Sequence, residues 1–230
     1  MTKFSKRHRG NREKVNDDAV YALTEGIAAL KSTQGAKFDE TVDIAINLGI
    51  DPRKSDQSVR GAVSLPHGTG KSKKVIAFVK DPDKQAAARE AGAAEVGDDD
   101  LVKRVSDGWL DFDVAIAAPD MMGKVGRLGK VLGPQGKMPT PKSGTVTADV
   151  AKAVKEFAAG KVEFRADAGA TIHGPVGRRS FSDDQIAENV QAFLTAVNAL
   201  RPATAKGHYV KKIFLSTTMG PGLSVDLASV

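Results

Sequence analysis

Residues 121–147, a stretch rich in glycine and cations, offer the clearest chemistry in this 230-residue sequence. The cations, with no acidic residue among them, are Lys124, Arg127, Lys130, Lys137 and Lys142, and glycines stand at 123, 126, 129, 133, 136 and 144. Glycine lets the backbone approach another molecule closely, and nearby cations favour an anion. The Gly-x-x-Gly-x-x-Gly spacing is not the dinucleotide fingerprint, and flexibility alone does not explain five cations. The stretch therefore predicts a loop that contacts an anionic partner.

A second glycine cluster, Gly68-Thr69-Gly70-Lys71-Ser72, is similar to the end of a phosphate-binding loop. That motif needs a glycine five residues before its second glycine, so that backbone amides surround the phosphates. Leu65 occupies this position, Pro66 has no amide to offer, and an apolar strand rather than a helix is expected to follow. We interpret the segment as a linker and expect no nucleotide hydrolysis.

The residue types that usually carry catalysis are sparse. The absence of cysteine excludes disulfides, thiolate zinc sites and a cysteine nucleophile. His8, His67, His173 and His208 have no metal-ligand neighbour at helical or turn spacing, and no Gly-x-Ser-x-Gly elbow occurs. The sequence therefore predicts no enzyme, no metal site and no cofactor.

The charge of the chain lies in separate patches. Lys and Arg number 34 against 28 Asp and Glu, which gives a net charge of +6. Beyond the stretch above, cations gather at Lys3, Lys6, Arg7, Arg9, Arg12 and Lys14 and again at Arg201, Lys206, Lys211 and Lys212. Separate basic patches favour RNA or DNA as the partner. Too few Trp and Tyr residues are present for a stacking platform, so backbone and shape recognition is expected.

The sequence also predicts where the protein is located. No apolar run reaches membrane-spanning length, and the N-terminus lacks the apolar core of a signal peptide, so a cytoplasmic location is expected.

A segment near the C-terminus could contact RNA. Ser216-Thr217-Thr218-Met219-Gly220 offers hydroxyls and amides that can bind phosphates and 2′-OH groups. An ordinary Gly/Pro turn explains these five residues equally well, and residue types alone leave both interpretations open.

The elements that position these residues have one character at the two ends of the chain. A helix is expected over 19–30, and Lys37–Leu48 alternate as a strand with Phe38, Val42, Ile44, Ile46 and Leu48 on one face. A second extended run, Ser58–Leu65, predicts a hairpin with this strand. The C-terminal part predicts strands over 161–165, 171–176 and 211–216, alternation at Leu223, Val225 and Leu227, and a helix with a Ser182/Gln185 capping box.

The middle of the chain has another character. Strands over 74–80, 94–96 and 113–117 alternate with helices that begin at Asp81-Pro82 and span 98–107. This order implies a parallel sheet in three layers. Thr147 is expected to cap a further helix, Ala148–Ala158.

The predicted fold is therefore mixed, α/β and α+β, with two domains. Residues 1–67 and 159–230 are expected to form a split α+β domain with an antiparallel sheet and helices. Residues 68–158 are expected to form an inserted three-layer, Rossmann-like α/β domain. The two crossings, near Pro66-His67-Gly68 and Ala159-Gly160, would act as a hinge.

Three stretches resemble a known family. KFDETVDIAINLGIDPRKSDQSVRGAVSLPHG, GRLGKVLGPQGKMPTPKSGTV and STTMGPG are similar to motifs of the bacterial large-subunit ribosomal stalk proteins, the "L-one" family. The likeness extends from about Lys3 to Val225. It implies a fold in which the KFDETV and STTMGPG motifs lie side by side and contact RNA.

The resemblance also implies particular site residues. The two motifs supply Lys37, Phe38, Glu40, Thr41 and Val42 and then Ser216, Thr217, Thr218, Met219 and Gly220. Arg165 and Asp167 transfer less directly, because the family commonly has a lysine where this chain has Ala168. Arg127, Lys130 and Lys137 are expected to make secondary RNA contacts through phosphate charge.

The resemblance implies that the protein is a structural constituent of the large ribosomal subunit and that it is a monomer when it is not bound to the ribosome. It implies binding of large-subunit rRNA at the stalk near the tRNA exit site, and a contact with exit-site tRNA that aids release of deacylated tRNA. It also implies repression of the protein's own operon through its mRNA. The alternative is an α/β enzyme that binds a phosphorylated ligand through residues 123–136.

Overall fold

Strand β2, residues Thr41–Leu48, lies inside the larger sheet and is paired along both of its edges. The computed structural model describes residues 5–16 and 19–229. The sheet has the order β1-β10-β9-β2-β8, antiparallel throughout except for the parallel pair β1 and β10. The side chains of Val42, Ile44, Ile46 and Leu48 are buried, as the alternating pattern predicts.

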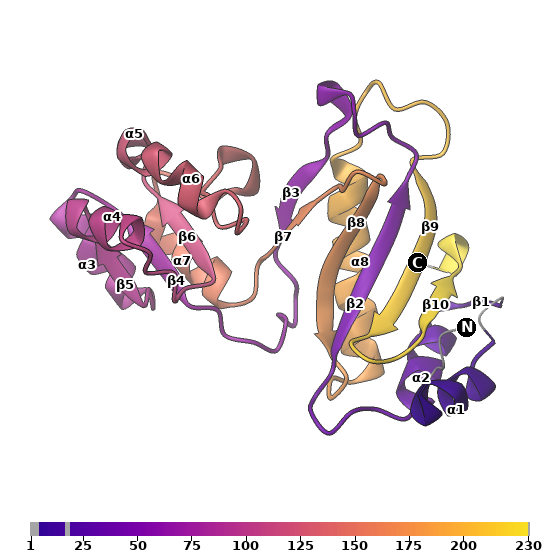
Figure 1. The fold of residues 1–230 in the computed structure, drawn as a ribbon. Coiled ribbons are helices and arrows are strands. Elements are labelled where there is room, and N and C mark those ends of the chain that lie inside the picture. Colours follow the sequence, from indigo (N-terminus) through magenta and orange to yellow (C-terminus); the bar gives the residue numbers. More distant parts are fainter. Residues whose placement is uncertain (1–4, 17–18, 230) are drawn as a thin grey trace. The chain divides into compact units, whose positions relative to one another are not determined.

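The chain divides into two units (Figure 1). Unit 1 consists of the described residues up to Gly70 together with those from Val162 onward, and unit 2 is Lys71–Lys161. The elements of unit 1 are α1 (Lys6–Lys14), β1 (Val20–Tyr21), α2 (Leu23–Ser32), β2, β3 (Arg60–Val63), β7 (Val162–Arg165), β8 (Thr171–Arg178), α8 (Asp183–Ala199), β9 (Val210–Thr217) and β10 (Gly222–Val225). Those of unit 2 are β4 (Val75–Phe78), α3 (Pro82–Glu90), β5 (Glu95–Gly97), α4 (Asp99–Ser106), β6 (Val114–Ala117), α5 (Met122–Val125), α6 (Gly129–Leu132) and α7 (Val150–Ala158).

The predicted mixture of helices with parallel and antiparallel sheets is confirmed. The domain boundaries at 67/68 and 158/159, the hinge and the Rossmann-like character of the insert stay predictions. Over the described ranges, no helix combines the length and hydrophobicity that crossing a membrane requires.

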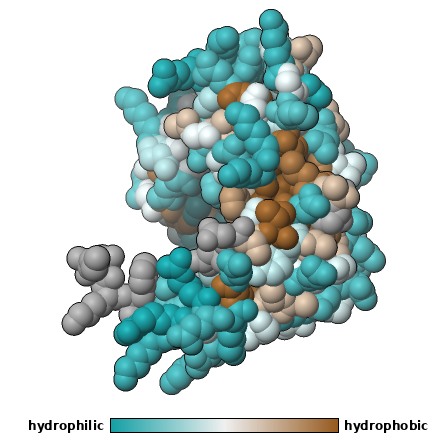
Figure 2. Space-filling view, turned by 90° about the vertical axis from the view of Figure 1, so that its right-hand side faces the viewer, coloured by the Kyte–Doolittle hydropathy of each residue, from teal (hydrophilic) through white to brown (hydrophobic). Residues whose placement is uncertain are grey.

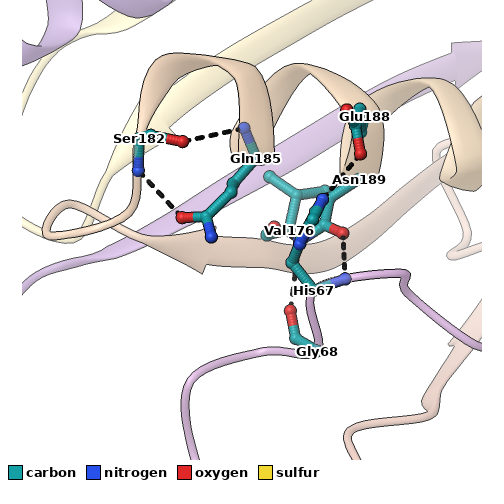
Figure 3. Close-up of polar contacts among 7 residues, drawn as sticks. All are labelled: His67, Gly68, Val176, Ser182, Gln185, Glu188 and Asn189. Atoms are coloured by element: carbon teal, nitrogen blue, oxygen red, sulfur yellow. Dashed lines mark hydrogen bonds and ion pairs between the residues drawn. The ribbon is translucent and has the colours of Figure 1, made fainter.

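Helix α8 shows how closely sequence signals can specify an element. Ser182 Oγ accepts a hydrogen bond from the Gln185 amide at 3.2 Å, and Gln185 Oε1 accepts one from the Ser182 amide at 3.0 Å (Figure 3). This is the predicted capping box, which satisfies two amides that the helix leaves unpaired. The predicted apolar stripe, Ile186, Val190, Phe193, Leu194 and Val197, is buried in the core of unit 1.

A buried side-chain amide on α8 binds the backbone of the segment that connects unit 1 to unit 2. Asn189 is fully buried and accepts a hydrogen bond from the His67 amide at 3.1 Å. Its own Nδ2 donates to the carbonyls of Gly68 and Val176, at 3.1 and 2.7 Å (Figure 3). His67 Nε2 also lies 2.6 Å from a Glu188 carboxylate oxygen. The backbone at 67–68 therefore belongs to the packed part of unit 1.

The predicted hairpin between β2 and the run Ser58–Leu65 is wrong. Strand β3 lies in that run but pairs with β7 in a separate two-stranded sheet. Strand β2 has no free edge for β3, because β8 and β9 occupy both. Phe38 lies before β2 and is 55% exposed, so it does not share the buried face of the strand.

Smaller corrections concern element ends. Val20 and Tyr21 form strand β1, so the predicted helix over 19–30 begins only at Leu23. Leu227 lies in a 3₁₀ turn and is 43% exposed, so the buried alternation stops at Val225.

Unit 2 is built around a parallel three-stranded sheet of order β5-β4-β6, with the predicted sequence of strands and helices. All four residues of the central strand β4 are buried. One face packs on α3 and α7 through residues that include Phe157, and the other packs on α4 and the segment after β6 through residues that include Leu132.

The glycine-rich stretch forms helical turns where the sequence predicted a loop. Residues 122–132 fold as α5, a 3₁₀ turn over Gly126–Leu128, and α6. Met121, Val125, Leu128 and Leu132 are buried at helical spacing, while a Cβ placed at Gly123, Gly126 or Gly129 would meet open space. The glycines conceal an amphipathic pattern, because small residues on the exposed side carry no polar signature.

The cap of α7 also differs from the prediction. Asp149, not Thr147, is the N-cap and accepts from the Lys152 amide at 3.1 Å. Thr147, two residues before this N-cap, instead accepts from the Asp149 amide at 3.2 Å through Oγ1. Gly160, with φ 112°, then ends the segment after the helix in a conformation that favours glycine.

Candidate functional site

The start of β2 and the end of β9 meet at one end of the larger sheet. Val42 pairs in register with Thr217, and the Thr218 amide donates to the Thr41 carbonyl at 3.1 Å. Thr218 Oγ1 in turn accepts from the Thr41 amide at 3.0 Å. The motifs KFDETV and STTMGPG, which are far apart in the sequence, are therefore joined directly. We call their ten residues, 37–38, 40–42 and 216–220, the strand-end surface.

A buried carboxylate holds this surface together. Glu40 is 1% exposed, and its carboxylate accepts from the Ala36 amide and, at 3.4 Å, from the Met219 amide. Burial raises the pKa of Glu40, but the Thr217 hydroxyl, the Ala36 and Met219 amides and the Arg179 charge outweigh it and leave the pKa lowered. Glu40 is therefore charged at neutral pH and links the segment before β2 to the turn after β9.

The turn itself requires a glycine. The Gly220 amide donates to the Thr217 carbonyl at 3.1 Å, and a Cβ at position 220 would lie 2.3 Å from Thr217 Oγ1. Thr217 Oγ1 is buried without a hydrogen bond of regular geometry, although its proximity favours the charged form of Glu40. Any side chain at position 220 would have to displace this hydroxyl.

The strand-end surface presents a mixed set of groups to solvent. Phe38 is 55% and Met219 48% exposed, and Lys37 and Thr218 are exposed beside them. Val42, Glu40 and Thr217 are buried, and so they support the surface from beneath. An aromatic ring, a thioether, an ammonium and a hydroxyl around a fixed turn can pack on bases or sugars and bind phosphate, but they include no acid–base pair for catalysis.

Three residues that sequence reasoning missed, Arg178, Arg179 and Ser180, complete the support. Ser180 Oγ donates to Asp39 at 2.8 Å, and the Arg178 guanidinium donates to the Asp39 carbonyl at 2.8 Å. Arg179 donates to the carbonyls of Lys31, at 2.8 Å, and of Thr33. The sequence feature that could have indicated these contacts is the run Arg178-Arg179-Ser180 at the end of a strand. Only the register of β8 on β2, which pairs Arg178 with Thr41, shows what it supports.

Asp167 lies near the other end of the sheet, and Arg165 belongs to β7 in the separate two-stranded sheet. Asp167 Oδ1 accepts from the Gly169 and Thr171 amides, each at 2.8 Å, and closes the turn before β8. The Thr171 amide is the main cause that lowers the Asp167 pKa. Thr171 pairs with Asn47, six residues along β2 from Thr41, or about 20 Å at about 3.3 Å per residue. The structure thus does not bring these two residues to the strand-end surface.

The cations of unit 2 fall into two groups. Arg127 and Lys130 are exposed, and no ion pair to either is seen in the part of the chain that the structure describes. Lys124 lies 2.6 Å from Asp99 and 3.3 Å from Asp98, and the Asp99 contact is the main cause that raises the Lys124 pKa. Lys137 donates to the Leu110 and Phe112 carbonyls at 3.1 and 2.6 Å. Its ammonium therefore has a structural role within unit 2.

The remaining titratable groups form no catalytic or metal centre in what the structure describes. His173 lies 3.7 Å from Asp167, and His67 contacts Glu188, but no group of three or more His, Cys, Asp or Glu residues within 5–16 and 19–229 is arranged to hold a metal ion.

Comparison with known proteins first gives the class: the relatives are ribosomal proteins. The chain is 56% identical to the large ribosomal subunit protein uL1 of Cutibacterium acnes, over 97% of this chain and 96% of that protein. It is 51% identical to uL1 of Protochlamydia amoebophila, over 99% of this chain and 96% of that protein.

A family model then gives the particular family. The model described as the ribosomal protein L1p/L10e family matches residues 30–221, and the chain belongs to this family. The resemblance seen in the sequence is confirmed. The protein is a ribosomal structural protein located on the ribosome and not an enzyme, which overturns the alternative of an enzyme using residues 123–136.

Proposed function

We propose that this protein is built into the large ribosomal subunit and binds its rRNA through the strand-end surface. The observation that carries the proposal is the double contact between Thr41 and Thr218, which joins two distant motifs at one end of the sheet with Phe38 and Met219 exposed beside it. The names of the relatives, large ribosomal subunit proteins, support this partner.

The surface suits recognition of RNA shape. Its fixed elements are backbone and hydroxyl groups, which contact phosphates and 2′-OH groups, and its exposed apolar groups can pack on a base or sugar. Trp109, the only tryptophan, lies in unit 2 and not on this surface. A folded RNA with a matching backbone is therefore the expected ligand, in preference to a single strand read by stacking.

We extend the proposal to the partners that the family resemblance implies. The stalk region of the rRNA near the tRNA exit site is the first ligand, and exit-site tRNA is contacted by the assembled stalk. The protein's own operon mRNA would bind the same strand-end surface by presenting the same backbone shape, which would repress translation. Arg127 and Lys130 add phosphate contacts. Lys137, whose ammonium is bound within unit 2, supports that unit rather than the RNA.

The test is a binding titration of the whole chain with a stalk fragment of large-subunit rRNA and with an unrelated folded RNA of equal length. We expect the stalk fragment to bind with a specificity ratio of at least about 10³ at moderate salt. An operon mRNA leader should compete for the same protein. Equal affinity for both folded RNAs would contradict specific recognition. Failure of the leader to compete would remove only the repressor part.

A further inference from the structure

Helix α1, Lys6–Lys14, carries cations in its first turn that the helix itself does not need. Its sequence is KRHRGNREK, with Glu13 as the only acid. The first turn holds Lys6 and Arg7 and no acidic residue. Cations at a helix N-terminus oppose the helix dipole and weaken the helix. Lys6 and Arg7 are therefore poorly placed for the stability of the helix, whereas Arg12 and Lys14 in its last turn are favourably placed.

Despite its charge, α1 is firmly attached to unit 1. Asn11 is 1% exposed and makes two hydrogen bonds with the backbone of Gln34, Nδ2 to the carbonyl at 3.0 Å and Oδ1 from the amide at 2.7 Å. Val15, directly after the helix, is 3% exposed in the core. Two separate anchors thus fix both the position and the rotation of α1, which mere solubility does not require.

The anchor lies next to the strand-end surface. Gln34 precedes Lys37 by three residues, a separation of at most about 11 Å for an extended chain. Between them, the Ala36 amide binds Glu40, whose carboxylate also binds the Met219 amide. Figure 1 shows α1 beside α2 at the end of the sheet where β2 begins, and Figure 2 shows hydrophilic side chains at that lower end as well as over the upper part of this face. The anchor of α1 thus lies at most about 11 Å from Lys37, a distance comparable to the Debye length of roughly 8–10 Å.

We propose that α1 is a second RNA-binding surface that contacts the phosphates flanking the RNA held by the strand-end surface. Lys6 and Arg9 lie three residues apart on the exposed side of the helix, where they can reach adjacent phosphates. Asn11 positions them by fixing the helix on Gln34. The inference rests on the proposed RNA-binding function and adds a contact to it.

The experiment compares two double variants of the full chain that remove the same charge. Lys6→Gln/Arg9→Gln removes two cations of α1. Arg53→Gln/Lys54→Gln removes two exposed cations of unit 1 in the segment after Leu48, at the opposite end of β2 from Thr41. Each variant is titrated with the stalk rRNA fragment at several salt concentrations, and its thermal unfolding is measured. Glutamine keeps helix propensity close to that of lysine, so α1 should persist.

We expect the α1 variant to reduce the slope of log affinity against log salt by about 0.7–0.9 for each lost phosphate contact, about 1.4–1.8 in all. The control should reduce it by much less, and neither variant should unfold at a lower temperature than the wild type. A wild-type slope in the α1 variant, or an equal reduction in the control, would overturn the inference.

Failure of the underlying function looks different. In that case the wild-type chain itself does not prefer the stalk fragment to the unrelated RNA, and Met219→Ala changes nothing. If the wild type binds specifically and Met219→Ala weakens it while the α1 variant matches the control, only the role of α1 is lost.

Discussion

The two units of this protein cover their sheets in different ways, and the difference decides what each can bind. In unit 2 the parallel sheet is buried on both faces, and its central strand β4 has no exposed residue. In unit 1 helices α2 and α8 pack on one face of the sheet, and the residues of β2 alternate between buried and half-buried (Figure 1). Unit 1 therefore keeps strand ends and backbone turns accessible, whereas unit 2 offers side chains on its helices and loops.

The cations of the two units also differ in how available they are to a binding partner. Lys37 in unit 1 is exposed beside a buried, charged Glu40 that organises the turn. In unit 2, Lys124 and Lys137 are engaged by Asp98, Asp99 and backbone carbonyls. The basic stretch of unit 2 thus carries fewer available charges than its composition indicates. We infer that unit 1 recognises RNA and that unit 2 at most adds charge.

Separating the two units should have the largest effect on rRNA binding. Replacing 71–161 by a short Gly/Ser linker should leave a unit 1 that unfolds cooperatively and still binds the stalk rRNA fragment. The linker can close, because β3 pairs with β7 and brings Val63 opposite Val162. Unit 2 alone should fold but lose specific binding entirely. Circular dichroism melts and filter binding on both halves measure this.

The same experiment can contradict the assignment of rRNA recognition to unit 1. If unit 2 alone binds the stalk fragment specifically, recognition lies in residues 71–161 and our assignment of unit 1 fails. If unit 1 alone does not unfold cooperatively, the units are not independent domains.

The next effect comes from matched cavities in the two cores. Phe193 in unit 1 and Phe157 in unit 2 are both fully buried, and replacing either by alanine should cost about 3–5 kcal/mol within its own unit. Phe193→Ala should lower both the unfolding midpoint of unit 1 and the affinity for rRNA. Phe157→Ala should lower the stability of unit 2 and leave binding close to wild type. Denaturant melts with parallel titrations test this, and equal losses of binding in both variants would show that recognition needs both units.

Local sequence signals predicted much of this fold. The capping box at Ser182 and Gln185 and the alternation of β2 specify an element through neighbours within a few residues. The partner of β3 could not be predicted in this way, because β7 lies about a hundred residues further along the chain and the free edges of the sheet are a property of the whole fold. The helical turns at 122–132 were missed because glycines occupied the positions where polar residues would have revealed the pattern.

The candidate site was predictable only in outline. The two motifs named its exposed residues through family resemblance, and the sheet register then brought them together. Neither the KFDETV motif, which contains Asp39, nor the Arg178-Arg179-Ser180 run shows the supporting contacts of Arg179, Asn11 and Asp39. Each binds a backbone group or side chain more than 20 residues away in the sequence, and only the folded structure shows the pair.

Replacing Glu40 should have a smaller effect on stability, because it changes one buried group of unit 1. Its folded pKa lies below its ordinary value of 4.5, so the charged form stabilises unit 1 above that pH. This stability should be lost as the pH falls below about 4.5 through the folded pKa. Glu40→Gln should cost about 1–3 kcal/mol at neutral pH and flatten this acid-side decline. Melting curves between pH 3 and pH 7 measure both, with the exposed Glu90→Gln of unit 2 as the control.

The smallest effects separate recognition by shape from recognition by charge. Met219→Ala removes a half-exposed side chain that we expect to pack on RNA, and it should weaken binding by about 1 kcal/mol, or about fivefold, at every salt concentration. Arg127→Gln/Lys130→Gln should instead reduce the salt slope by at most about 0.7–0.9 for each contact, so that its effect fades at high salt. Neither variant should shift the melting temperature, since all three side chains are substantially exposed. Thr218→Val is less clean, because its hydroxyl accepts from the Thr41 amide and its loss would also destabilise the turn. A Met219→Ala variant that binds like wild type, beside an Arg127/Lys130 variant that loses specificity as well as charge, would move recognition from the shape of unit 1 to the surface of unit 2.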